Sequence, residues 1–129
     1  DRIWEAAQQV DADIYMNIQG DEPMLNHADI QKLAGIKKLN MDCVVNGMIK
    51  LSSDEIPENI NIPKVVTTED NHLVYMSRLP IPGWKSQKNK PTFYFKQVSI
   101  YGFSYAELEA FGKFGRKSYL EEKEDIEKI

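Results

Sequence analysis

The sequence predicts an α/β protein in which an antiparallel section extends a mixed sheet. Helix-type and strand-type segments alternate in the first half of the chain, and a hairpin and a long strand candidate follow in the second half. At 129 residues, of which 42% are apolar, the chain can bury most of a core, which excludes disordered and fibrous classes. We expect one domain over residues 1–129, incomplete at both ends.

The first half of the chain contains two helix candidates and two strand candidates. Apolar residues at helical spacing over 3–10 predict a helix, and β-branched and aromatic residues over 13–18 predict a strand that enters a turn. Asn26 can cap a second helix, whose apolar stripe comprises Ile30, Leu33, Ala34 and Ile36. Residues 43–49 predict the next strand.

The second half of the chain contains a hairpin, a long loop and the longest strand candidate. Residues 64–68 and 72–77 are rich in β-branched residues and are joined by Glu69-Asp70-Asn71, which is a good hairpin signal. The prolines, glycine and lysines between residues 79 and 91 predict an exposed loop. Residues 93–103 then predict a strand that completes the antiparallel section.

Two helices are expected near the C-terminus because the capping-box pattern occurs twice. It occurs at Ser104-Tyr-Ala-Glu107 and at Ser118-Tyr-Leu-Glu121, where each serine can bind an amide and each glutamate can reach back to the cap. The first helix should stop near Gly112 or Gly115, whereas the second has no glycine or proline stop signal before Ile129. We therefore expect a cut C-terminus, and also a cut N-terminus, because the first helix has no visible cap.

Composition and charge narrow the class of partner. The net charge of −4 works against binding to a nucleic-acid backbone. No apolar run approaches the roughly 18 residues that cross a bilayer, and the start lacks signal-peptide features, so a cytoplasmic protein without a membrane partner is expected. Cys43 is the only cysteine and is expected to be a small buried side chain in a strand, while His27 and His72 lack partners at metal-binding spacing.

The residues that carry candidate chemistry begin with Gln19-Gly20-Asp21-Glu22-Pro23, directly after a predicted strand. Ligands of open α/β sheets bind beyond the ends of strands. Gly20 permits close approach of the backbone, Gln19 offers an amide to a base or ribose, and Asp21 offers the hard oxygen that Mg²⁺ prefers. The same pattern also fits a plain turn.

A family resemblance favours a functional site at this turn. The stretch Tyr15-Met-Asn-Ile-Gln-Gly-Asp-Glu-Pro-Met24 resembles the central motif of the 3-deoxy-manno-octulosonate (Kdo) cytidylyltransferases, the CMP-Kdo synthetases. Four further stretches resemble the family in the same order: Asn61-Ile-Pro-Lys-Val-Val66, Val74-Tyr-Met-Ser-Arg-Leu-Pro-Ile-Pro82, Tyr94-Phe-Lys-Gln-Val-Ser-Ile-Tyr-Gly-Phe103 and Leu120-Glu-Glu-Lys-Glu-Asp-Ile-Glu127. The resemblance implies a nucleotide-diphospho-sugar-transferase-like mixed sheet.

The resemblance also implies an activity in lipopolysaccharide biosynthesis. The anomeric hydroxyl of an eight-carbon sugar acid would attack the α-phosphate of CTP, releasing pyrophosphate and forming a CMP-sugar. Such transfers depend mainly on positioning and charge neutralisation. By position in the motif, Asp21 would be the Mg²⁺ ligand, and Gln19 and Gly20 would contact the nucleotide. The family further implies a homodimer through the hairpin and long strand.

The sugar acid would contact residues from the later stretches. Arg78 could hold its carboxylate bidentately, although a surface ion pair is the plainer interpretation. The resemblance places Gln97, Tyr101 and Glu127 in the sugar pocket. Each also has a structural alternative: Gln97 on the solvent face of a strand, Tyr101 as a core aromatic and Glu127 as an exposed helix residue.

Departures from the family pattern leave the substrate open. Many members carry histidine where Gln97 stands, glycine where Ser99 stands, and glutamine or an apolar residue where Lys128 stands. An enzyme acting on a sialic acid is one alternative, and a non-catalytic binding or dimerisation module is another. The family's basic phosphate loop would precede Asp1 and its second metal-binding aspartate would follow Ile129, so we expect the chain alone to be inactive.

Overall fold

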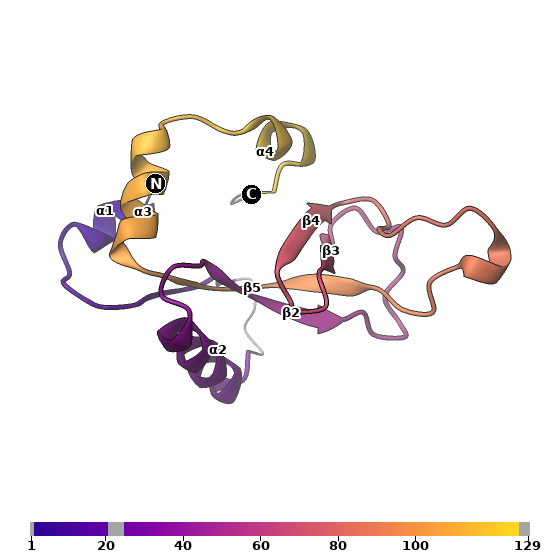
Figure 1. The fold of residues 1–129 in the computed structure, drawn as a ribbon, viewed down its shortest axis with the longest axis horizontal. Helices are drawn as coiled ribbons and strands as arrows, with labels where there is room; N and C mark the ends of the chain where they lie inside the picture. Colours follow the sequence, from indigo (N-terminus) through magenta and orange to yellow (C-terminus); the bar gives the residue numbers. More distant parts are fainter. Residues whose placement is uncertain (1, 21–24, 127–129) are drawn as a thin grey trace. The chain divides into compact units, whose positions relative to one another are not determined.

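The computed structural model describes residues 2–20 and 25–126 of the chain. Helices and strands follow the order α1 (Arg2–Ala7), β1 (Tyr15–Ile18), α2 (His27–Leu39), β2 (Val45–Lys50), β3 (Lys64–Thr67), β4 (Leu73–Ser77), the 3₁₀ turn η1 (Gln87–Asn89), β5 (Phe95–Phe103), α3 (Tyr105–Phe114) and α4 (Tyr119–Glu124) (Figure 1). The predicted mixed α/β class with an antiparallel sheet is confirmed.

The chain divides into two compact units. The first unit comprises residues 1–47 and 98–116, and the second unit comprises residues 48–97 and 117–129. The strand β5, which pairs with β1, β2 and β3, contributes residues to both units.

The first unit packs β1, α1 and α3 around an aromatic core. The strand β1 pairs antiparallel with the end of β5, with Tyr15 opposite Phe103. The buried core comprises Ala7, Tyr101, Phe103 and Leu108. A Cβ atom at Gly112 would lie 2.4 Å from the Trp4 ring, so α1 and α3 can approach this closely only with glycine at that position.

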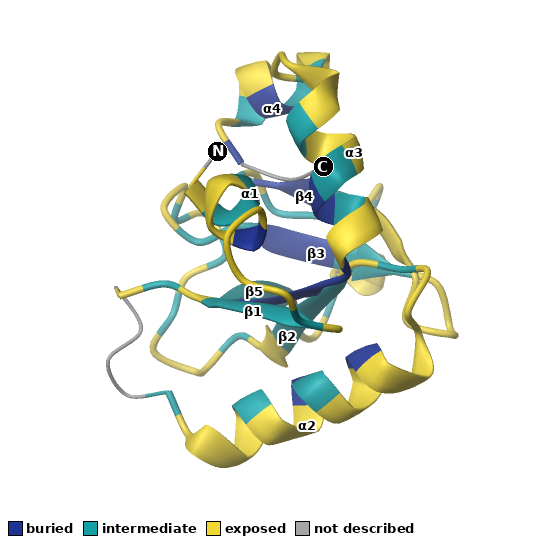
Figure 2. Cartoon of the chain, turned by 90° about the vertical axis from the view of Figure 1, so that its left-hand side faces the viewer, coloured by how far each residue is buried: buried dark blue, intermediate teal, exposed yellow. Residues whose placement is uncertain are grey.

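The helix α2 confirms the predicted apolar stripe in part, since Leu33 is buried and Ile30 and Ala34 are half-buried. Its Asn26 cap is confirmed, since the side chain accepts from the amide of Ala28. The helix is exposed over most of its surface (Figure 2), and Ile36 is 41% exposed, so placing Ile36 on a core stripe was wrong. Lys37 is fully buried instead, because its Nζ finds a carboxylate partner in Glu107 on α3.

The position of Cys43 also differs from the prediction. It lies in the turn before β2 rather than in the strand, and it is only half-buried. Its carbonyl oxygen accepts a 2.7 Å hydrogen bond from Lys37 Nζ. The buried lysine needs several acceptors, and the turn that supplies them delays the start of β2.

The second unit contains the predicted hairpin. The strands β3 and β4 pair antiparallel, with Val65 opposite Met76, and β3 also pairs with the start of β5. Asn71 adopts the left-handed conformation at φ 63°, which asparagine tolerates in turns. Val65, Met76 and Ile126 form the core of this unit, with Met48 and Phe95 packed against them.

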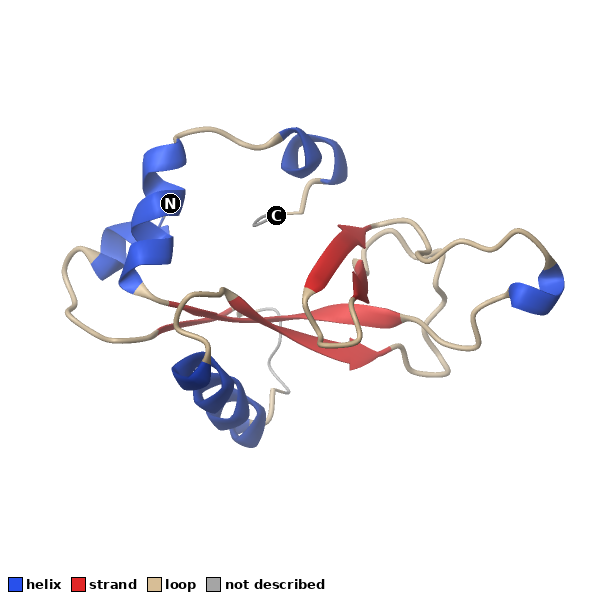
Figure 3. Cartoon of the chain, viewed as in Figure 1, coloured by secondary structure: helices blue, strands red, loops and turns tan. Residues whose placement is uncertain are grey.

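The long connection between β4 and β5 is a loop, as predicted. It contains the single turn η1 (Figure 3), and residues 83–85 and 87–90 within it are exposed. Over the described residues 2–20 and 25–126, no helix is both long and apolar enough to cross a membrane.

Both predicted capping boxes are present at the starts of α3 and α4. The helix α3 is followed by Gly115 in the left-handed conformation at φ 66°, which confirms one of the two predicted stops. The helix α4 ends at Glu124, and Asp125 then adopts φ 48°, so the expected continuation of this helix toward Ile129 was wrong. Arg78 binds the carbonyls of Glu124 and Asp125 at this end of the helix.

Candidate functional site

The predicted nucleotide corner begins where β1 ends. The main-chain amide of Gln19 donates a 3.2 Å hydrogen bond to the carbonyl of Ser99, which continues the β1–β5 pairing beyond Ile18. Gly20 is exposed, and a Cβ there would meet no described atom within 4 Å. Asp21 lies outside the described residues. The roles of Gln19, Gly20 and Asp21 therefore stay predictions.

Tyr101 lies close to this corner in the pairing of the first unit. It stands opposite Asn17 on β1, two positions before the Gln19–Ser99 pair. Its side chain is buried, and its ring is stacked with that of Phe103 at a centroid distance of 6.1 Å. This burial fits a core aromatic, and the predicted sugar contact stays untested.

Two further predicted site residues belong to the second unit. Gln97 is half-buried, and its main-chain amide donates a 3.1 Å hydrogen bond to the carbonyl of Pro63. Arg78 follows directly after β4. Glu127 lies outside the described residues. The described site residues thus fall into two groups, Gln19 with Gly20 and Tyr101 in the first unit, and Arg78 with Gln97 in the second.

The guanidinium of Arg78 is held by main-chain carbonyl oxygens. Its Nε donates to Glu124 at 2.5 Å, and its two terminal nitrogens donate to Ile60 at 2.9 Å and to Asp125 at 2.6 Å. The planar guanidinium suits such a set, because its N–H groups point in fixed directions. The predicted contact with a carboxylate stays a prediction, and the described partners of the side chain are these carbonyls.

Glu124 is a residue that the sequence interpretation did not single out. Its Oε1 accepts hydrogen bonds from Tyr75 Oη at 2.9 Å and Ser77 Oγ at 2.8 Å, and its Oε2 accepts from the Arg78 amide at 3.0 Å. The Arg78 amide, followed by Ser77 and Tyr75, holds the pKa of Glu124 below its usual value against the effect of burial. The hydrogen bond to Glu124 in turn raises the pKa of Tyr75.

One signal could have pointed to Glu124. A carboxylate in the last turn of a helix lies at the negative end of the helix dipole, where an anion is unfavourable. A glutamate in the last turn of a helix is therefore a candidate for a tertiary hydrogen bond that compensates this unfavourable position.

Lys64 adds a second buried cation next to Arg78. It is fully buried, and its Nζ donates to the carbonyls of Asn59 and Arg78. Burial lowers the pKa of Lys64, and the charge of Arg78 lowers it further. The charges of Glu58 and Glu124 oppose this shift.

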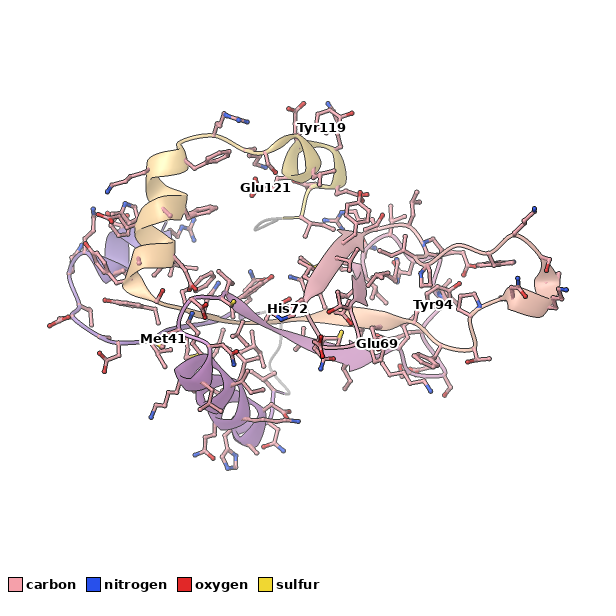
Figure 4. The ribbon with its side chains drawn as sticks, in the orientation of Figure 1. Met41, Glu69, His72, Tyr94, Tyr119 and Glu121 are labelled. Atoms are coloured by element: carbon pink, nitrogen blue, oxygen red, sulfur yellow. The ribbon has the colours of Figure 1, made fainter. Side chains whose placement is uncertain are left out.

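Tyr94, labelled in Figure 4, is a buried group whose hydroxyl lacks a partner. It is 5% exposed, and its Oη has no hydrogen-bond partner among the described residues. Burial, followed by the charge of Glu58, raises the pKa of Tyr94. Buried hydroxyls usually form hydrogen bonds, so the Tyr94 Oη is an exception. It is free to bind a group from outside the described residues.

A metal site cannot be built from the described residues. Within 2–20 and 25–126, no three histidine, cysteine, aspartate or glutamate side chains gather closely enough to hold an ion. The predicted ligand Asp21 lies outside these ranges. Its carboxylate is nonetheless the donor type that Mg²⁺ accepts beside phosphate oxygens, and Mg²⁺ commonly uses few protein ligands.

Comparisons with known proteins cover the whole chain. The sequence profile of a family described as cytidylyltransferase matches residues 1–129. A 3-deoxy-manno-octulosonate cytidylyltransferase of Chloroherpeton thalassium is 34% identical over 134 residues, covering 100% of this chain and 53% of that protein. One of Acidobacterium capsulatum is 38% identical, covering 100% of this chain and 51% of that protein.

A solved structure agrees with these sequence relatives. It is a CMP:2-keto-3-deoxy-manno-octonic acid synthetase in complex with CTP, and it matches with a TM-score of 0.86 and 31% identity over 98% of this chain and 51% of that chain. The chain thus spans about half the length of the relatives it matches.

The antiparallel sheet, its helices and this structural match define the class as a nucleotide-sugar transferase fold. Within that class, the chain belongs to the cytidylyltransferase family. The resemblance drawn from the motifs is therefore confirmed.

Proposed function

We propose that the protein containing this chain transfers a cytidylyl group from CTP to a sugar acid of the 3-deoxy-manno-octulosonate type, with release of pyrophosphate. The observation that carries this proposal is the match of the entire chain to Kdo cytidylyltransferases in both sequence and structure. Family membership also favours an enzyme over a non-catalytic binding module.

The proposed roles follow the sequence predictions. Asp21 would hold Mg²⁺, which would neutralise charge on the phosphates during the transfer. Gln19 and Gly20 would contact the nucleotide. The sugar would contact Gln97, Tyr101 and Glu127, and its carboxylate would be bound by Arg78. The adjacency of Gln19, Ser99 and Tyr101 in the β1–β5 pairing supports a shared nucleotide and sugar corner in the first unit.

The test is an assay of pyrophosphate release by the full-length protein with CTP, Mg²⁺ and Kdo. Replacing Asp21 by alanine should lower kcat about 100-fold or more, as expected for loss of a group that stabilises transition-state charge. Asp42→Ala, at an exposed turn, is the matched control and should retain activity. If the wild-type protein releases pyrophosphate with a sialic acid but not with Kdo, the sialic acid replaces Kdo as the proposed substrate.

We also infer a cytoplasmic homodimer that supplies activated sugar for lipopolysaccharide. Leu73 and Val74 on β4 are 47% and 61% exposed, and β4 ends the strand order of the sheet. Exposed apolar residues on an edge strand are a common site of self-association. Light scattering of the full-length protein should give a dimer, and a monomer at micromolar concentration would contradict this inference.

A further inference from the structure

We propose that Asn46 is a further contact for the sugar acid, as part of a row of uncharged polar side chains that crosses the sheet of the first unit. The row comprises Asn46 on β2, Ser99 on β5 and Gln19 after β1, and all three residues are half-buried. The role rests on the proposed function, and it assigns to Asn46 the recognition of a hydroxyl group of the sugar.

The row lies on one face of the sheet. A Cβ atom at Gly47 would lie 3.1 Å from the Cβ atom of Val98, so these two positions face the same side. Side chains alternate between the two faces along a strand, so the neighbouring residues Asn46 and Ser99 share the other face. The amide of Gln19 donates to the Ser99 carbonyl and continues the β1–β5 pairing, and residues opposite each other share a face. The three side chains therefore form one row.

The side chain of Asn46 has a fixed orientation. Its Nδ2 donates to the carbonyls of Val98 at 3.0 Å and Ile100 at 2.8 Å, the residues on either side of Ser99. Both partners are acceptors, so the amide nitrogen must face them and the amide oxygen must point away from them. Within residues 2–20 and 25–126, no group donates a hydrogen bond to that oxygen. Asn46 Oδ1 is therefore an acceptor that is held in place before any ligand binds.

A purely structural role accounts for only half of the Asn46 amide. The strand β5 is already paired with β1, β2 and β3, so its place in the sheet does not depend on Asn46 alone. Asparagine is also depleted in strands, where β-branched and aromatic residues pack better. The amide nitrogen binds the protein, and the amide oxygen is left for a ligand.

The chemistry of the row selects the part of the substrate that it would bind. Asparagine, serine and glutamine are uncharged, so the row cannot neutralise a phosphate or a carboxylate, whereas a hydroxyl group can donate to Asn46 Oδ1. Ser99 and Tyr101 alternate with Ile100 along β5, which places the row on the same face as the predicted sugar contact Tyr101. Gln19, the proposed nucleotide contact, lies at one end of the row, and Asn46 lies at the other end, across β5. The Asn46 end therefore fits the hydroxyl-bearing part of the sugar acid.

The experiment measures transfer by the full-length protein with CTP, Mg²⁺ and either Kdo or analogues of Kdo that each lack one hydroxyl group other than the reacting anomeric one. The wild type should lose about 10-fold in kcat/KM with one of these analogues, because the missing hydroxyl leaves an acceptor of the site unpaired. Asn46→Ala should use Kdo and that analogue equally well, with a KM for Kdo raised about 10-fold and a KM for CTP within about twofold of the wild type.

Asn40→Ala is the matched control, because the exposed Asn40 amide also donates to a main-chain carbonyl, that of Ile36. This variant should retain the wild-type loss with the analogue. If Asn46→Ala retains that loss too, or lowers only the thermal stability, Asn46 is a structural residue and the proposed contact is rejected. A raised KM for CTP with an unchanged KM for Kdo would assign Asn46 to the nucleotide and would also reject it.

Failure of the Asn46 contact is distinguishable from failure of the proposed function. If the wild type releases no pyrophosphate with any sugar acid, the proposed function fails and the Asn46 contact fails with it. If the wild type transfers the cytidylyl group to Kdo and Asn46→Ala discriminates among the analogues as the wild type does, only the Asn46 contact is rejected.

Discussion

Each compact unit buries a lysine completely, and the two ammonium groups differ in the groups that they bind. In the first unit, Lys37 Nζ lies 2.8 Å from both carboxylate oxygens of Glu107. In the second unit, Lys64 Nζ donates to the carbonyls of Asn59 and Arg78, and burial lowers its pKa. A carboxylate neutralises a cation, whereas carbonyl dipoles only solvate it. The second unit therefore carries its buried positive charge at a greater electrostatic cost.

The units also differ in how their helices end. The helix α3 in the first unit stops at Gly115, a residue that adopts the left-handed conformation without strain. The helix α4 in the second unit stops at the non-glycine residue Asp125, where Arg78 binds the carbonyls. The end of α3 thus has a local glycine signal, whereas the end of α4 is also bound by a side chain distant in the sequence.

The largest expected effect breaks the paired lysine of the first unit. Lys37→Met leaves the partly buried carboxylate of Glu107 without its cation, and this should lower the free energy of unfolding by about 3–5 kcal/mol. Denaturant unfolding of the full-length protein measures the change. Lys38→Met, at an exposed position of the same helix, is the control. If Lys37→Met lowers the free energy of unfolding no more than the control does, the Lys37–Glu107 ion pair does not stabilise the fold.

A smaller effect is expected for Lys64 of the second unit, whose hydrogen bonds go to carbonyl oxygens. Lys64→Met leaves two carbonyls unsatisfied but removes a buried charge, so a loss of about 1–3 kcal/mol is expected, less than for Lys37→Met. Lys88→Met, in the exposed loop, is the control. A loss equal to or larger than that of Lys37→Met would erase the contrast between the two units.

The same variant tests the direction of the pKa shift. The pKa of Lys64 is lower in the folded protein than the ordinary 10.5, so between these two pH values the unfolded chain binds more protons. The stability contribution of Lys64 should therefore rise with pH across this window. Lys64→Met should abolish that rise.

The smallest effect concerns a more exposed ion pair of the second unit, Lys96 with Glu55. The hydrogen bond from Lys96 lowers the pKa of Glu55 from 4.5 to about 2. The pair stabilises the fold above pH 4.5, and the contribution is lost as the pH falls toward about 2. Because solvent and salt screen the pair, Glu55→Gln should cost about 1 kcal/mol at neutral pH.

The pH dependence separates this pair from others. Unfolding of Glu55→Gln should depend less on pH between 4.5 and about 2 than unfolding of the wild type. Glu122→Gln, whose carboxylate is exposed, should retain the wild-type pH profile. An unchanged profile in Glu55→Gln would show that the Lys96 pair does not contribute to acid stability.

Much of the fold was predictable because its signals are local. The Asn26 cap, the two capping boxes and the turn at Asn71 each depend on residues within a few positions, and all were confirmed. Ile36 was misplaced because helical spacing cannot tell which side of a helix meets a carboxylate. Lys37 occupies the buried position instead, through a partner 70 residues away.

The candidate site was only partly predictable. Motif position predicts roles for Gln19, Arg78 and Tyr101, and these roles stay predictions. Glu124 was missed because its partners Tyr75, Ser77 and Arg78 lie 46 to 49 residues away in the chain, and no neighbouring residue identifies them.

The sequence by itself determined the family, the α/β class and the turns and caps, because these depend on motifs, periodicity and short-range hydrogen bonds. Only the tertiary structure decided where α4 ends, which lysines are buried and what Arg78 binds. The physical reason is that a buried charge or an unpaired helix carbonyl must find a partner wherever the fold brings one. That partner is set by the packing of distant segments.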